Sequence, residues 1–202
     1  MRTWRFETVL ADVTALSGGN PHLRDSLPPG GDLQLWDDER AVRILFPDEA
    51  AAILLRLDLA EIPLSCLLAI PGMPDPTGDH SGRLPLPDDF LRLAAFRMPG
   101  WHQTLTATPP SGTLRGALGG ATPKRSHSPR FPAIHFADAA SGKILEFYGA
   151  PDPGEAPATA LYIPRPRWRP DDTLLLPEEI YPTAVRSTAS KIKETPWIPK
   201  IN

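Results

Sequence analysis

Proline constrains this chain more than any other residue type. It accounts for 26 of the 202 residues, about 13%, where roughly 5% is usual. Each proline removes a backbone hydrogen-bond donor and is disfavoured inside helices and central strands. We therefore expect short secondary-structure elements joined by long, stiff, extended connections. The backbone groups of such connections must be paired by water or by a neighbouring subunit.

Apolar residues make up 41% of the chain, enough for a sizeable core. We predict an α+β fold in which a few helices pack with a small antiparallel sheet or hairpin arm, with extended proline-rich connections. The predicted organisation is a single domain over residues 1–193, followed by an extended tail over 194–202. Within the domain we expect a helical part over 1–70, a β-rich part over 84–165 and a C-terminal helix over 177–193.

Three helices are predicted from apolar spacing and from their start and stop signals. Residues 6–16 have helical spacing and are stopped by Gly18 and Gly19. A second helix is expected to begin at Pro47, while the stretch 40–46 before it fits either a strand or a helix. The last helix is expected to open near Pro177, and Pro182 leaves a later start open.

Strand signals are concentrated in the middle of the chain. Residues 131–149 predict an antiparallel hairpin, and residues 160–163 predict a third strand. Residues 90–98 favour a strand, with a short helix as the alternative. We interpret residues 71–89 as a connection and residues 107–130 as a flexible loop.

The distribution of charge is more informative than the net charge of −3. Residues 1–75 hold 6 basic and 12 acidic side chains, and residues 76–202 hold the remaining 15 and 12. This polarity suits head-to-tail contact between like subunits or a position near nucleic acid, although ordinary surface variation would also produce it. The lone Cys66 lies in an apolar run and favours a buried residue in a reducing compartment. No signal peptide or membrane span is expected.

Catalytic, cofactor and metal motifs are not evident. The five histidines do not pair with each other or with Cys66 at the spacing of metal ligands. His80, beside Asp79 and near Asp75, could suggest a metal ligand or a general base, but its polar setting favours a solvated turn. We therefore predict no catalytic residue, no cofactor and no metal, and we do not expect an enzyme.

Two basic segments are candidates for contact with an acidic partner. The glycine-rich loop carries four basic side chains that could attract nucleic-acid phosphates, with a solvated basic loop as the alternative: Arg115, Lys124, Arg125 and Arg130. A second segment alternates arginine with proline and tryptophan. In an extended conformation its three arginines would line one side, as a partner contact, a DNA-facing stripe or a charged protective edge: Arg165, Arg167 and Arg169.

The tail combines large apolar side chains with no helix or strand pattern that could bury them. These side chains are Trp197, Ile198 and Ile201. They are expected to dock on another chain, with docking on their own domain or disorder as alternatives. Tryptophan is enriched among interface hot spots, which favours the first interpretation.

The order of short motifs resembles that of a known family. The stretch Leu84-Pro85-Leu86-Pro87-Asp88-Asp89-Phe90-Leu91-Arg92-Leu93 precedes Trp101, and Leu145-Glu146-Phe147-Tyr148, Ala160-Leu161-Tyr162-Ile163-Pro164 and a helix around residues 181–189 follow. Across roughly residues 40–192 this resembles the head–tail adaptor (connector, or ring) proteins of tailed phages and prophages, especially those of gut bacteria. The chain departs from that pattern in its high proline content and short last helix.

The resemblance implies a structural role in the virion neck. Such proteins form a ring, often of twelve copies, between the portal protein and the tail proteins, and are made in the cytoplasm of the bacterial host. It implies a homo-oligomer, a tail 194–202 that docks on the portal or on a neighbour, and a basic loop 115–130 that faces DNA in the channel. The alternatives are a nucleic-acid-binding accessory protein and a small ligand-binding or enzymatic domain.

Overall fold

The computed structural model describes residues 1–18, 33–78, 80–107, 128–139 and 142–194. These residues form two compact units. The helical unit comprises Met1–Cys66 together with the described residues from Arg165 onward, and the β unit comprises Leu67–Pro164. Our prediction of one domain over 1–193 did not anticipate this division. The β unit is inserted in the sequence between the two segments that build the helical unit.

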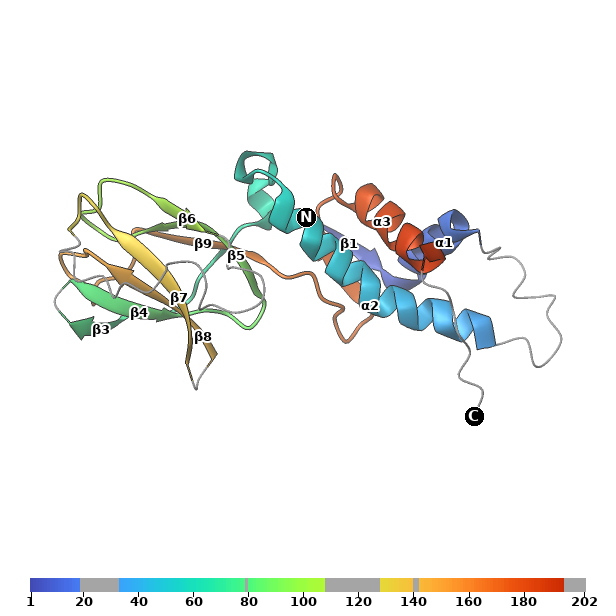
Figure 1. The fold of residues 1–202 in the computed structure, drawn as a ribbon, viewed down its shortest axis with the longest axis horizontal. Helices are drawn as coiled ribbons and strands as arrows, with labels where there is room; N and C mark the ends of the chain where they lie inside the picture. Colours follow the sequence, from blue (N-terminus) through green and yellow to red (C-terminus); the bar gives the residue numbers. More distant parts are fainter. Residues whose placement is uncertain (19–32, 79, 108–127, 140–141, 195–202) are drawn as a thin grey trace. The chain divides into compact units, whose positions relative to one another are not determined.

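The helical unit contains the three α-helices of the described chain. They are α1 (Phe6–Ser17), α2 (Leu33–Arg56) and α3 (Tyr181–Glu194), and they pack together (Figure 1). A two-stranded antiparallel ribbon joins the two segments of the unit, because β1 (Arg2–Arg5) pairs with β10 (Thr173–Leu176). Two short 3-10 helices, η2 (Leu59–Glu61) and η3 (Leu64–Cys66), follow α2.

Helix α1 confirms the prediction for residues 6–16. Its apolar spacing buries Val9 and Val13 completely. The helix ends where Gly18 adopts a left-handed conformation with φ of 91°, and the Gly18 N–H donates to the carbonyl of Thr14. Glycine adopts this conformation at little cost, which explains the stop at this position.

Helix α2 begins at Leu33, so the predicted start at Pro47 is wrong, and the ambiguous stretch 40–46 is helical. Pro47 lies inside the helix, where proline cannot donate to the carbonyl four residues earlier, that of Arg43. The indole N–H of Trp168 donates to this carbonyl at 3.0 Å. A distant residue thus supplies the partner that the local sequence cannot.

Helix α3 begins at Tyr181, which confirms the later start that Pro182 left open. Its buried face packs Tyr181 into an aromatic cluster. The Tyr181 ring stacks on Trp4 with centroids 3.5 Å apart and meets Phe46 edge-on at 5.9 Å. Phe46 also lies beside Trp168, at 6.0 Å. The cluster therefore connects β1, α2, α3 and the segment before β10.

The β unit consists of two four-stranded antiparallel sheets. The first has the order β2-β9-β5-β6, formed by Leu68–Ala69, Thr159–Pro164, Phe90–Arg97 and Leu105–Ala107. The second has the order β3-β4-β8-β7, formed by Asp75–Gly78, Ser81–Pro85, Gly142–Tyr148 and Ala133–Ala139. Our prediction of a few helices with a small antiparallel sheet or hairpin arm is wrong. The described chain holds three antiparallel sheets and is a sheet-rich α+β fold.

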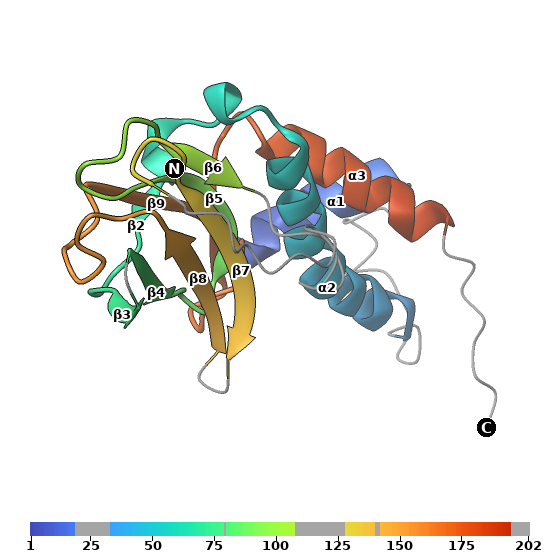
Figure 2. The same ribbon diagram turned by 60° about the vertical axis from the view of Figure 1, so that its left-hand side comes forward.

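The two large sheets enclose one apolar core (Figure 2). Phe96 of β5 meets Phe147 of β8 with ring centroids 5.4 Å apart, and Phe90 of β5 meets Phe136 of β7 at 5.6 Å. Trp101 closes one end of this core, and its indole N–H donates to the carbonyl of Gly149 at 3.0 Å. The hairpin predicted over 131–149 and the strands predicted at 90–98 and 160–163 are confirmed as β7–β8, β5 and β9.

Strands β3 and β4 occupy a stretch that we interpreted as a connection over 71–89, and that interpretation is wrong. On the core face of β4, Gly82 lies against the ring of Phe147, its partner on β8. A Cβ atom at Gly82 would lie 2.5 Å from Phe147 Cζ, a distance that side chains do not tolerate. The glycine that suggested a loop is thus the residue that lets β4 pass beneath an aromatic ring.

Candidate interaction surfaces

The turn Ser128–Phe131, which we name the anchor turn, holds an exposed aromatic side chain in a fixed place. The Phe131 N–H donates to the Ser128 carbonyl at 2.9 Å, closing a four-residue turn. The His102 N–H donates to the Pro129 carbonyl at 3.2 Å. On its other side Ser128 lies against Gly149, where a Cβ atom would come within 2.6 Å of the Ser128 carbonyl oxygen.

The two residues at the tip of the anchor turn project into solvent. Phe131 is 69% exposed, and Arg130 beside it is exposed as well. Burying a phenylalanine side chain is worth about 1.5–3 kcal/mol, and a turn that is already ordered loses little entropy on binding. The anchor turn therefore has the properties of a preorganised contact point for a partner.

A second exposed apolar group lies in the helical unit, around η3. Leu64 is 83% exposed, and Met1 is 41% exposed. The terminal amino group of Met1 donates to Ser65 Oγ at 2.9 Å, which brings the two apolar side chains into one neighbourhood. Leu64 and Phe131 are the two most exposed large apolar side chains of the described residues.

Exposed carboxylates lie near Leu64 in the sequence and near its neighbour Cys66 in the fold. We name this region the acidic patch and define it as Leu64, Met1 and Arg2 with the exposed acids Asp58, Glu61, Glu178 and Glu179. Asp58 and Glu61 form a capping box on η2, and Glu179 lies close enough to Cys66 to act on its thiol. Glu178 pairs with Arg2 at 2.9 Å. Four carboxylates against Arg2 and the amino group leave a net charge of −2 on the acidic patch.

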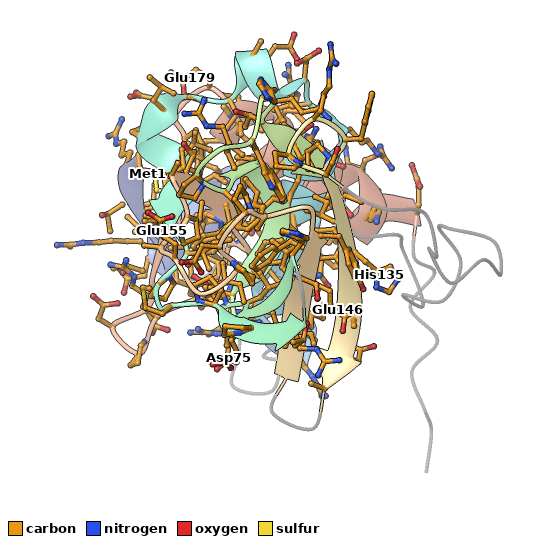
Figure 3. All side chains as sticks on the ribbon, turned by 90° about the vertical axis from the view of Figure 1, so that its left-hand side faces the viewer. Met1, Asp75, His135, Glu146, Glu155 and Glu179 are labelled. Carbon is orange, nitrogen blue, oxygen red and sulfur yellow. The ribbon has the colours of Figure 1, made fainter. Side chains whose placement is uncertain are left out.

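A charged row crosses the second sheet of the β unit on its outer face. Asp75, Arg83, Glu146 and His135 lie opposite one another on β3, β4, β8 and β7. Arg83 Nε donates to Glu146 Oε1 at 2.9 Å, and the Tyr148 hydroxyl donates to Glu146 Oε2 at 3.2 Å. Figure 3 shows Glu146 and His135 side by side.

Within the charged row, His135 and Glu146 are close but not hydrogen-bonded to each other. His135 Nδ1 lies 3.7 Å from Glu146 Oε2, which is beyond hydrogen-bond distance. The Glu146 carboxylate already accepts from Arg83 and Tyr148. Burial, and then the neighbouring Glu146 carboxylate, raise the pKa of Tyr148. Opposite charges across neighbouring strands stabilise a sheet, and we assign this role to the row.

A buried carboxylate in the helical unit resembles a catalytic group at first sight. Glu49 of α2 accepts from Ser187 Oγ at 2.5 Å and pairs with Lys191 Nζ, both on α3. Burial raises the pKa of Glu49, but the contacts with Lys191 and Ser187 outweigh it and hold that pKa below its ordinary value of 4.5. A Ser–Lys nucleophile needs a neutral amine that accepts the serine proton. Ser187 and Lys191 both use their polar atoms on Glu49, so these contacts tie α2 to α3.

Residues 165–169 show the alternation of exposed and buried side chains that the sequence pattern predicted. Arg165, Arg167 and Arg169 are exposed, while Pro166 is buried and Trp168 is half-buried between them. Arg165 pairs with the exposed Asp48 at 3.6 Å, and Asp172 pairs with Arg43 at 2.7 Å in the same region. Ion pairs as exposed as that of Arg165 contribute little to stability.

The other candidate site residues predicted from the sequence differ in where they lie and in whether the structure describes them. Arg130 is exposed on the anchor turn, whereas the other three basic residues of the loop, Arg115, Lys124 and Arg125, lie outside the described residues. The tail residues Trp197, Ile198 and Ile201 also lie outside them. Cys66 is buried as predicted, and burial raises the pKa of its thiol. His80 is exposed in a turn, with Nδ1 at 2.8 Å from the Ala150 carbonyl oxygen.

Within the described ranges, no cluster of histidine, cysteine and acidic side chains could hold a metal ion. None of the described helices is both long and apolar enough to span a bilayer. No family model matches the chain, no curated protein is detectably similar to it, and no solved structure resembles it.

Sequence reasoning missed both exposed apolar groups. Leu64 lies in an apolar run that suggested burial, and its exposure depends on the tight turn of η3. Phe131 offered a local signal, because Pro129 and Pro132 flank it and a proline-framed aromatic residue is poorly placed to join a strand.

Proposed function

We propose that this chain is a structural subunit of the neck of a tailed phage or prophage, a head–tail adaptor that assembles as a ring between the portal and the tail. The observation that supports this most is the division of the chain. A helical unit is built from both segments that flank an inserted β unit, residues 67–164. Each subunit of a ring contacts two neighbours through two different surfaces, and two compact units in one chain can supply them.

The amino-acid sequence of the tail supports the same proposal. Helix α3 ends at Glu194, and the eight residues that follow include Trp197, Ile198 and Ile201. Large apolar side chains in a segment without a helix or strand pattern favour docking on a portal or a neighbouring subunit. Burial of a tryptophan and two isoleucines would account for much of the binding energy of such a contact.

Exposed apolar anchors also favour a protein that acts by assembly. Leu64 and Phe131 each leave most of their surface in water, although both sit on tightly hydrogen-bonded turns. Scattered exposed apolar residues are common in monomers. Two such residues held in fixed positions are better explained by partners. The DNA-facing role of Arg115, Lys124, Arg125 and Arg130 stays a prediction of this proposal.

Mass measurement on the full chain and on a chain ending at Glu194 tests the proposed function. We expect the full chain to form a ring-sized particle, or to capture the portal protein encoded in the same genome, and the shortened chain to lose that capture. Substitution of Trp197→Ala should reproduce most of the loss, whereas Ile44→Ala, which removes another exposed apolar side chain, should not. A monomer that neither assembles nor captures the portal, with or without its tail, would refute the proposal.

A further inference from the structure

We propose that the anchor turn of one subunit docks on the acidic patch of the next copy of this chain. The inference rests on the proposed function, since it names the subunit contact of the ring. It starts from the two most exposed large apolar side chains of the described residues, Phe131 at 69% and Leu64 at 83%. They lie in different compact units. The exposed Arg130 precedes Phe131, whereas the exposed Glu61 lies three residues before Leu64.

The charges of the two surfaces complement each other. The anchor turn carries Arg130 as its one ionisable side chain, while the acidic patch carries four carboxylates and a net charge of −2. Glu179 is exposed and lies near Cys66, two residues after Leu64. An Arg130–Glu179 pair beside a Phe131–Leu64 contact would place an apolar centre next to a charged rim, the usual anatomy of a protein interface.

Both surfaces are held in shape before any contact forms. The anchor turn is tied to His102 and rests against Gly149. On the other surface the capping box of Asp58 and Glu61 orders η2, and the Cys66 N–H donates to the Pro63 carbonyl at 2.9 Å across η3. Rigid, complementary surfaces of this kind favour specific association.

The two surfaces differ, so a contact between them is head-to-tail. A heterologous contact between identical subunits generates a closed ring when its rotation closes. This is the symmetry that a neck adaptor requires. The partner is therefore a second copy of the chain, and neither an acidic peptide nor nucleic acid is needed to explain the complementarity.

Site-directed crosslinking tests which chains meet. In a Cys66→Ala background, Leu64→Cys and Phe131→Cys are placed on separate copies, which are mixed in equal amounts and oxidised. We expect a disulfide between residues 64 and 131 that joins two chains, identified by mass spectrometry of the linked peptides. As a second arm, a single chain carries both substitutions. If this chain forms the disulfide only within itself, even at high concentration, the inference is overturned.

Charge exchange provides the second test, read as the concentration dependence of self-association. Arg130→Glu and Glu179→Arg should each weaken association by about tenfold, and the two together should restore it. Phe131→Ala should weaken it by at least about tenfold, whereas Met73→Ala, which removes an apolar side chain that is 56% exposed, should have no effect.

The outcomes separate this inference from the proposed function. A ring that forms normally despite Phe131→Ala and both single charge reversals would overturn the inference and leave the adaptor role standing. A chain that stays monomeric and captures no portal would refute both. If Arg130→Glu abolished DNA binding and Glu179→Arg did not restore self-association, Arg130 would belong to a DNA-facing surface and the inference would fail.

Discussion

The indole N–H of Trp168 donates to the main-chain carbonyl of Arg43 at 3.0 Å, and this carbonyl is the one that Pro47 leaves without its helical partner. The two residues are 125 positions apart in the sequence. A proline inside a helix removes one hydrogen bond and strains the preceding turn. Here the tertiary fold replaces the missing donor, so that a helix of 24 residues runs through a proline.

We predict that Trp168→Phe destabilises the chain by about 1–3 kcal/mol, because the partly buried carbonyl of Arg43 loses the donor that replaces its helical partner. The cost should fall by about 1 kcal/mol in a Pro47→Ala background, where the alanine N–H can take over. Denaturant unfolding of the four proteins of this double-mutant cycle measures the coupling. Equal costs of Trp168→Phe in both backgrounds would show that the hydrogen bond contributes nothing.

Helix α2 also shows why part of the fold escaped the sequence analysis. A proline followed by two acids is a common helix start, and the local pattern around Pro47 could not reveal a donor on Trp168. By contrast, helix α1 was predicted correctly because its apolar spacing and its stop at Gly18 are local signals. Elements whose stability depends on distant residues cannot be predicted from a short window of sequence.

Strand β5 gives a second physical reason why part of the fold could not be predicted from the sequence. It pairs with β9 through two bulges, one between Phe90 and Arg92 and one between Leu93 and Ala95. Each bulge inserts a residue and shifts the alternation, so Phe90, Leu93 and Phe96 all face the core at a spacing of three. That spacing mimics a helix, which explains why a short helix remained an alternative for residues 90–98.

The candidate surfaces were predictable only in part. The exposure of Arg130 follows from its polar, proline-rich setting. Leu64 was hidden by the assumption that an apolar run is buried, although a 3-10 turn can bury Cys66 and turn Leu64 outward. The acidic patch brings together residues near positions 60 and 178, and no local pattern relates two such segments.

We predict that Gly82→Ala destabilises the β unit by about 1–3 kcal/mol, because its Cβ would lie 2.5 Å from the Phe147 ring in a packed core. Gly78→Ala in the neighbouring strand β3 is the matched control. Its Cβ would meet only Ser81 Oγ, at 3.4 Å, which is an ordinary contact. Thermal unfolding compares the two variants.

Rescue of this variant by a smaller side chain at position 147 would strengthen the steric interpretation. Phe147→Leu alone should be destabilising, since it removes a fully buried ring. Combined with Gly82→Ala, however, it should cost less than the sum of the two single changes. If Gly82→Ala and Gly78→Ala lowered the melting temperature equally, the close approach of Phe147 to Gly82 could not be the cause.

The last prediction concerns the pH dependence of stability at Glu49. Its pKa in the folded chain lies below the ordinary value of 4.5, because the contacts with Lys191 and Ser187 outweigh the opposing effect of burial. A carboxylate with a lowered folded pKa contributes stability that is fully present above the unfolded pKa. This stability is lost as the pH falls through the folded pKa. Glu49→Gln should therefore cost about 1.5–3 kcal/mol at neutral pH.

That cost should shrink as the pH falls below about 4.5, since protonation of Glu49 in the wild-type chain removes the same ion pair. Unfolding free energies of both proteins, measured between neutral pH and pH 3, give the difference directly. Glu155→Gln is the control, because Glu155 is exposed and its substitution should give a small, constant difference. A Glu49→Gln cost that stayed constant across this range would mean that the carboxylate charge does not stabilise the packing of α2 on α3.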